Sequence, residues 1–213
     1  MELAPSPLRQ RRKQARPQEL LDAALELFVE KGFAATRAEE VAQRAGVSKG
    51  TLYLYFPSKE ELFKALIRQR LSGLIAEGMD RAASFSGPSS ALLEELILGW
   101  WERLGRTPAA GLHKVILAEV RNFPDLAQFY ADEVIAPASR LFTIAVQRGI
   151  DRGEFREMPV CEVAHALMAP VMFLALHRHS LGACPTHGTL LQPEAMLRVH
   201  LDLVLQGLKA PNT

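Results

Sequence analysis

The sequence predicts an all-α protein with a small N-terminal helical part and a larger C-terminal one. Apolar residues recur at helical spacing in nearly every segment from Leu21 to Leu208, and clusters of Gly, Pro and Ser separate these segments. No segment alternates between apolar and polar residues for long enough to indicate a strand. With 213 residues and 48% hydrophobic content, the chain can bury a substantial core in one domain or two.

The first 16 residues form a basic segment that contains two prolines. Its basic residues are Arg9, Arg11, Arg12, Lys13 and Arg16. We expect a flexible arm, either a solvated tail or a segment that reaches the backbone or minor groove of DNA, where negative potential attracts Arg. Pro17 then suits a first helical turn, and an apolar stripe runs from Leu21 to Phe28 before Gly32.

Two short helices are predicted to follow, joined by a tight corner. The first covers residues 36–45, with Thr36 and Glu39 as a capping box. Gly46 can take the positive φ that ends this helix, and Ser48 is a good N-cap for the next one, which runs to Phe56. The sequence therefore predicts two helices that meet at a corner capped by a hydroxyl group.

The second of these helices has one apolar face and one polar face. Leu52 and Phe56 share the apolar face, whereas the other carries Ser48, Thr51 and Tyr55, with Lys49 and Tyr53 beside it. Hydroxyl groups and Lys can donate to phosphates and base edges in a DNA major groove. We interpret this helix as the recognition helix of a helix-turn-helix; the alternative is an ordinary capped corner between two helices.

The surroundings favour the helix-turn-helix, because Ser58 and Glu61 form a capping box that opens a third helix. Over residues 17–67 the chain closely resembles the DNA-binding signature of the TetR family of bacterial transcriptional regulators. The matching residues are Gly32, Phe33, Thr36, Ala45, Gly46, Val47, Ser48, Gly50, Leu52, Tyr53, Tyr55, Phe56, Ser58, Lys59 and Glu60.

The resemblance implies a DNA-binding domain over residues 17–64 and a helical effector-binding and dimerisation domain over residues 65–213. It implies a transcriptional regulator, most often a repressor, that is released from its operator by a small molecule. It also implies that Lys59 and Tyr53 hold the DNA backbone, that Thr36 and Arg37 approach it, and that Ser48, Lys49, Gly50, Thr51 and Tyr55 lie at the groove. Many relatives carry an aromatic residue where this chain has Leu54, so the resemblance implies no DNA contact for Leu54.

The distribution of charge agrees with DNA binding by the N-terminal part. Residues 1–70 hold 13 Lys and Arg against 9 Asp and Glu, whereas residues 71–213 hold 12 against 15. Cys161 and Cys184 lie far apart without a paired spacing, which indicates neither a disulfide framework nor a zinc site. With no signal peptide and no apolar run of about 18 residues, we expect a cytoplasmic protein without a membrane anchor.

The C-terminal part is predicted to consist of helices alone. The helix that opens at Ser58 continues for four turns, with apolar positions from Leu62 to Ile75, and a break at residues 84–90 follows it. Further helices are expected at residues 91–103, 112–121, 124–149 (one or two helices), 160–179 and 193–208.

Two of these helices are candidates for a homodimer interface. Residues 164–176 are apolar nearly all round, so that helix must be covered on more than one side, and residues 193–208 form its partner. We expect Val171, Leu201 and Val204 to lie between the two subunits of a homodimer; the alternative is a core within one chain. A dimer would let two recognition helices read two half-sites.

Aromatic, Met and His residues on the central helices are candidates for the wall of an effector cavity. They are Trp100, Trp101, His113, Phe129, Tyr130, Phe142, Met168, Met172, Phe173 and His177. Each of them could instead be ordinary core. Their mixture suggests a small, mostly apolar ligand, with aromatic molecules among the candidates.

Catalysis, a metal site and a cofactor are not indicated. His177 and His179 are two residues apart and would point to different sides of a helix, and the chain has no G-x-S-x-G elbow, Gly-rich phosphate loop or Cys pair. The rival function is that of an architectural or protein-interaction factor that binds DNA without any effector. Ligand-dependent loss of operator binding would argue against this rival, and the absence of any internal cavity would argue for it.

Overall fold

The structure is a computed structural model that describes residues 7–184 and 191–210. Within these residues the chain is helical apart from its turns and one isolated antiparallel bridge between Phe155 and Lys209. The α-helices are α1 (Pro7–Lys31), α2 (Ala38–Arg44), α3 (Lys49–Tyr55), α4 (Lys59–Ile67), α5 (Gly73–Ser84), α6 (Ser89–Trp100), α7 (Gly111–Glu119), α8 (Pro124–Tyr130), α9 (Ala136–Asp151), α10 (Val160–Arg178) and α11 (Pro193–Leu208).

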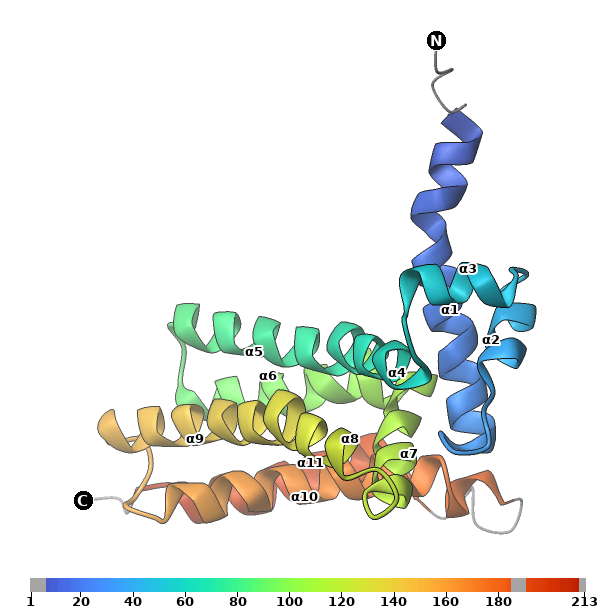
Figure 1. The fold of residues 1–213 in the computed structure, drawn as a ribbon. Coiled ribbons are helices and arrows are strands. Elements are labelled where there is room, and N and C mark those ends of the chain that lie inside the picture. The colour runs from blue at the N-terminus through green and yellow to red at the C-terminus, as the bar shows by residue number, and fades with distance from the viewer. Residues whose placement is uncertain (1–6, 185–190, 211–213) are drawn as a thin grey trace.

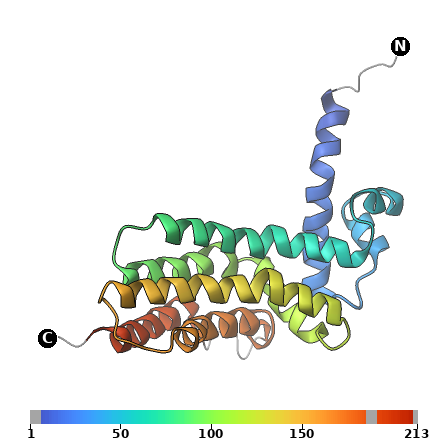
Figure 2. The ribbon, with the colours of Figure 1, turned by 60° about the vertical axis from the view of Figure 1, so that its left-hand side comes forward.

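The helices form two groups that meet at one end of a bundle. Helices α5, α6, α9, α10 and α11 lie alongside one another, and α1 crosses the end of this bundle with α2 and α3 packed on its side (Figure 1; Figure 2). Helix α3 is on the outer side of this small group, away from the bundle (Figure 1). The predicted all-α architecture in two parts is confirmed.

The N-terminal basic segment departs from the expectation. Helix α1 begins at Pro7 and contains Pro17 in its interior, so the backbone of residues 7–16 is helical and not extended. Pro17 has no N–H to donate to the carbonyl four residues earlier, so the helix continues there with one hydrogen bond fewer. Residues 1–6 of the predicted arm lie outside the described residues.

An aromatic cluster forms the core of the N-terminal group and continues into the second part of the chain. Phe63 packs against Phe28 and Phe33 with ring centroids 5.2 Å apart in both pairs. Phe123, from the loop before α8, packs on Phe33 at 4.9 Å. Because the same buried cluster also takes in residues of α7 and α8, the two groups of helices share one core where they meet.

Helices α4 and α5 form one continuous helical segment, as the apolar pattern predicted. A π-helical turn, η1 (Arg68–Ser72), joins them without a break. Similar π turns follow α6 at η2 (Trp101–Gly105) and α8 at η4 (Ala131–Ile135), and short 3₁₀ turns occupy η3 (Pro108–Ala110) and η5 (Leu181–Ala183). The segment from Lys59 to Ser84 therefore runs from the N-terminal group into the bundle.

A second core fills the bundle, and it corrects part of the expected dimer interface. Val171 and Leu201 are buried inside this single chain, at 8% and 3% exposure, and Val204 packs against the same core. These residues occupy one side of each helix, and the opposite side is uncovered. The exposed residues there are Ala166, Ala169 and Phe173 of α10 and Val199 and Leu203 of α11, which we call the α10–α11 face.

Among the described residues, one helix is long and apolar enough to span a membrane, namely α10. It packs on α7, α9 and α11 in the bundle. Its apolar composition is thus partly explained by neighbours within the chain, and the α10–α11 face remains to be covered.

Candidate nucleic-acid interface and internal cavity

The corner between α2 and α3 is built by the two residues that the sequence singled out. Gly46 has a φ of 65°. The N–H of Gly46 donates to the Gln43 carbonyl at 3.0 Å and the N–H of Val47 to the Ala42 carbonyl at 2.9 Å, the pattern of a Schellman motif. The Ser48 hydroxyl then accepts the N–H of Thr51 at 3.1 Å and caps α3. The predicted corner is therefore present in the structure.

The face of α3 turned away from the protein is formed by Gly50 and Leu54, one turn apart. Leu52 lies on the opposite face and is fully buried, as expected. Tyr53 is exposed at one edge of the outward face, and the ammonium group of Lys49 lies 5.8 Å from its ring centroid. Lys49 also pairs with Glu39 of α2, and the hydrogen bond that it donates to that carboxylate raises the pKa of Lys49.

Three predicted DNA-contacting residues of α3 are partly engaged within the protein. The hydroxyl oxygens of Ser48 and Thr51 are 2.9 Å apart and share a hydrogen bond. Tyr55 is partly buried and packs against the N-terminal core, and its place on the helix is closer to Leu52 than to Leu54. That it faces the groove stays a prediction.

Thr36 is placed differently from the prediction. Its side chain is 1% exposed, and its hydroxyl lies 2.7 Å from the Gly32 carbonyl, to which it donates at the end of α1. The capping box is shifted by one residue, because the Glu40 carboxylate accepts the N–H of Arg37 at 3.1 Å. Arg37 is exposed at the N-cap of α2, whereas the Thr36 side chain cannot reach DNA from this position.

Lys59 also has a different role from the one carried over by resemblance. Its ammonium group donates to the carbonyls of Phe33, Ala34 and Thr36 at 2.8, 3.3 and 3.0 Å, and it lies 4.4 Å from the Phe33 ring centroid. Burial lowers the pKa of Lys59. Lys59 therefore holds the loop between α1 and α2 in this structure, and its contact with the DNA backbone stays a prediction.

Lys59→Met should destabilise the fold because it leaves carbonyl oxygens of the loop without a donor. We expect the free energy of unfolding, measured with urea, to fall by about 2 kcal/mol. Lys64→Met, on the same helix, removes a part-buried pair with Glu61 and a contact with the Phe129 ring, and should cost less than about 1 kcal/mol. Unchanged stability of Lys59→Met, together with a weaker salt dependence of DNA binding, would instead make Lys59 a phosphate contact.

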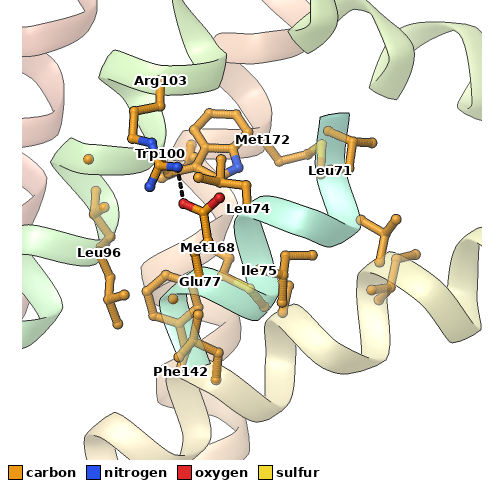
Figure 3. Close-up of a pocket in the computed structure, with 18 of the residues that line it drawn as sticks. Leu71, Leu74, Ile75, Glu77, Leu96, Trp100, Arg103, Phe142, Met168 and Met172 are labelled. Atoms are coloured by element: carbon orange, nitrogen blue, oxygen red, sulfur yellow. Dashed lines mark hydrogen bonds and ion pairs between the residues drawn. The ribbon is translucent and has the colours of Figure 1, made fainter. Parts of the chain in front are cut away.

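A cavity of about 320 Å³ lies in the bundle between α5, α6, α9 and α10 (Figure 3). Its wall is mostly apolar. The lining residues are Leu71, Leu74, Ile75, Glu77, Gly78, Arg81, Glu95, Leu96, Ile97, Gly99, Trp100, Arg103, His113, Tyr130, Val134, Ile135, Ala138, Leu141, Phe142, Met168, Val171 and Met172. This size is at the small end of the usual range for ligand sites, about 300–1,000 Å³.

Six of the ten predicted cavity residues line it: Trp100, His113, Tyr130, Phe142, Met168 and Met172. The other four do not. Trp101 is buried in the second core, where its indole N–H donates to Glu194 of α11 at 3.0 Å. Phe129 lies under the guanidinium of Arg68, and Phe173 is exposed beside His177 on α10.

Sequence reasoning missed the contribution of the α4–α5 segment. Leu71, Leu74 and Ile75 form an apolar stripe that looks like ordinary core packing, yet all three face the cavity. The charged residues around it, Glu77 and Arg103, were also missed, because nothing in their local sequence marks them. The structure pairs Arg103 with Glu77 beside Trp100 (Figure 3) and Arg81 with Glu95 at 2.5 Å.

The polar feature of the cavity wall is the pair His113 and Tyr130. The Nδ1 atom of His113 is hydrogen-bonded to the Tyr130 hydroxyl, and the His113 Nε2 atom has no partner. Burial lowers the pKa of His113 to about 4, with a smaller contribution from His179, and burial raises the pKa of Tyr130. Both side chains are therefore neutral near pH 7.

Helix α7 connects the cavity to the loop that Lys59 braces. His113 lines the cavity from α7, and Glu119 ends the same helix with 7% exposure. One carboxylate oxygen of Glu119 accepts the N–H of Ala34 at 3.0 Å, and the other accepts from Asn122 at 3.1 Å. The loop before α2 is thus held by Glu119 from one side and by Lys59 from the other.

The described residues contain no cluster of His, Cys, Asp and Glu suited to a metal ion. The side chains of Cys161 and Cys184 are exposed and unpaired.

Family comparisons agree with both parts of the chain. Residues 20–66 match the family described as "Bacterial regulatory proteins, tetR family", and residues 87–183 match "Tetracyclin repressor-like, C-terminal domain".

Similar proteins are regulators. The HTH-type transcriptional repressor KstR2 of Rhodococcus jostii (strain RHA1) is 28% identical over 94% of both chains. The uncharacterized HTH-type transcriptional regulator YfiR of Bacillus subtilis (strain 168) is 31% identical over 71% of this chain and 74% of its own. The transcriptional regulator FadR of B. subtilis, solved with stearoyl-CoA, has the same fold, with a TM-score of 0.65 at 19% identity over 90% of this chain and 98% of that one.

Proposed function

Because the chain belongs to the TetR family of bacterial regulatory proteins, we propose that it is a repressor whose α3 helix reads an operator and whose cavity binds the molecule that releases it. It is a DNA-binding transcription regulator and not an enzyme. Residues 17–64 form the DNA-binding domain in this proposal, and residues 65–213 form the effector and dimerisation domain. The helical basic segment before Pro17 extends the DNA-binding surface.

The observation that carries effector control is the position of α7. One end of this helix lines the cavity at His113, and the other holds the Ala34 amide through Glu119. A ligand that displaces α7 would shift the loop that leads into α2, and with it α3. Because binding to DNA needs two recognition helices at a fixed separation, a small shift in each subunit lowers affinity.

The second subunit is proposed to cover the α10–α11 face. Val199 and Leu203 are 61% and 67% exposed on one side of α11, next to the exposed Phe173 of α10. Helices near 160–179 and 193–208 would then form a four-helix interface in a homodimer. The exposed cysteines suit a reducing cytoplasm, where we place the protein.

The effector is proposed to be a small, mostly apolar molecule with a polar end. The cavity wall supplies aliphatic, aromatic and Met side chains for an apolar body. Arg81, which pairs with Glu95, and Arg103, which pairs with Glu77, lie where a polar end of the ligand would reach solvent. The stearoyl-CoA bound by FadR also joins an apolar chain to a polar end, but it is much larger than this cavity. The presence of a cavity supports this function over that of an architectural factor without an effector.

The experiment has two steps. The full-length protein first selects duplexes from a random-sequence DNA library, and the selected operator complex is then challenged with fatty acyl-CoA thioesters, free fatty acids and polycyclic apolar compounds. We expect one class to lower operator affinity by about 5–150-fold, the usual range of coupling between two sites. Selection without release by any class would support the architectural alternative.

Filling the cavity should abolish this response. Gly99 lines the cavity, and a Cβ atom built there meets nothing within 4 Å, so Gly99→Leu can place its side chain in the space of the ligand. We expect the variant to lose ligand binding, measured by the fluorescence of Trp100, while remaining helical. Ala83→Leu, at an exposed position on α5 outside the cavity wall, is the control and should bind ligand like the wild type. Ligand binding by Gly99→Leu would place the effector elsewhere.

A further inference from the structure

The most exposed large apolar side chain among the described residues lies on the outward face of the proposed DNA-reading helix. Leu54 is 84% exposed, more than Leu203 or Val199 on the proposed dimer face. It belongs to α3, which is on the outer side of the N-terminal group and away from the bundle (Figure 1). No packing within the chain accounts for a leucine at this position, so the side chain is free to contact a partner outside the chain.

Gly50, one turn before Leu54, is also not explained by the protein itself. Its φ is not positive, so any amino acid could adopt its backbone conformation. An added Cβ would meet only the Ser48 hydroxyl oxygen, at the ordinary distance of 3.8 Å. A glycine inside a helix is nevertheless less favourable than alanine by about 1 kcal/mol. The bare backbone beside Leu54 therefore suits the close approach of a partner.

The chemistry of Leu54 restricts what it can recognise. A leucine side chain has no donor or acceptor, so it cannot read the hydrogen-bonding groups of a base edge. The major groove has one apolar feature, the C5 methyl group of thymine. At the edges of this face, Lys49 and Tyr53 offer polar groups that suit the flanking phosphates.

We propose that Leu54 reads the methyl group of a thymine in each operator half-site, and that Gly50 lets α3 enter the major groove deeply enough for this contact. The inference rests on the proposed function, in which α3 is the DNA-reading helix. It assigns a specificity contact to Leu54, where the resemblance to the TetR family carries none over.

The test replaces each thymine of the selected operator, one position at a time, with deoxyuridine. This change removes the methyl group and keeps the base pair. We expect one position per half-site at which wild-type affinity falls about fourfold, the value of one buried methyl-sized group, and about fifteenfold when both half-sites are changed. Leu54→Ala should be insensitive to deoxyuridine at that same position.

Two controls separate reading from folding. Leu117→Ala makes the same change at an exposed site on α7 and should keep the full sensitivity to deoxyuridine. Gly50→Ala should be at least as stable to heat as the wild type yet bind the selected operator at least about tenfold more weakly, because its methyl group meets the DNA. Wild-type affinity for Gly50→Ala would overturn its role in helix depth.

The remaining outcomes are also decisive. If no deoxyuridine substitution lowers wild-type operator affinity, or if Leu54→Ala keeps the wild-type sensitivity, this inference is overturned and the proposed function stays intact. A library from which the wild-type protein enriches no sequence would contradict the proposed function and this inference together.

Discussion

Leu203→Glu yields a folded monomer that no longer binds an operator with two half-sites. Leu203 is 67% exposed in the single chain, so a carboxylate there is fully solvated in the monomer. In the proposed dimer the same charge would be buried without a partner, which strongly disfavours association. Because the second half-site multiplies affinity by about 10²–10⁴, we expect operator affinity to fall about 100-fold or more.

Sedimentation, circular dichroism and operator binding together check this result, and Leu201→Glu is the matched comparison. Leu201 is on the same helix but buried in the core of its own chain, so its replacement should lower helicity. If Leu203→Glu remains a dimer that binds DNA, the interface lies away from the α10–α11 face. If it loses helicity, Leu203 belongs to an intrachain core.

His113→Gln removes a large part of the acid sensitivity of the fold. Burial holds the pKa of His113 at about 4, against an ordinary value of 6.5. Between these values the unfolded chain binds a proton that the folded chain does not, so stability is highest above pH 6.5 and falls as the pH drops towards 4. The slope from this residue is about 1.4 kcal/mol per pH unit, or about 3 kcal/mol in all.

Urea unfolding at several pH values, at one protein concentration, measures this slope. Between pH 6.5 and 4, the free energy of unfolding of the wild type should fall by about 3 kcal/mol more than that of His113→Gln. Tyr130→Phe should keep the wild-type slope, because burial and not the hydroxyl group lowers the pKa of His113. Equal slopes for wild type and His113→Gln would mean that His113 is protonated in the folded state.

The local features of the fold could be predicted from sequence because their signals are local. Ser48 and Ser58 accept the N–H groups three residues ahead of them, as the N-cap pattern indicated, and Gly46 takes the positive φ that ends the preceding helix. Helix α11 has its predicted bounds, since Pro193 begins it and its apolar stripe ends at Leu208.

Other contacts could not be predicted because the local pattern allows more than one partner or because the partner is distant in sequence. Thr36 resembles an N-cap, but its hydroxyl donates backwards to the Gly32 carbonyl, and Lys59 donates to carbonyls 23–26 residues away. The apolar stripe of Leu71, Leu74 and Ile75 has the same sequence pattern whether its side chains pack on a neighbour or line a cavity. Only the packing of α5 against α6, α9 and α10 leaves the cavity there.

The central claim is that a cavity ligand controls DNA binding through α7. Its most direct test compares, in two proteins, the ratio of operator affinity without ligand to operator affinity with ligand. Operator affinity is measured without and with a saturating amount of the ligand that releases the wild type, and then again for Glu119→Ala, which removes the acceptor of the Ala34 N–H. We expect a ratio of about 5–150 in the wild type and less than about threefold in the variant, with ligand binding retained. An unchanged ratio in Glu119→Ala would contradict the account.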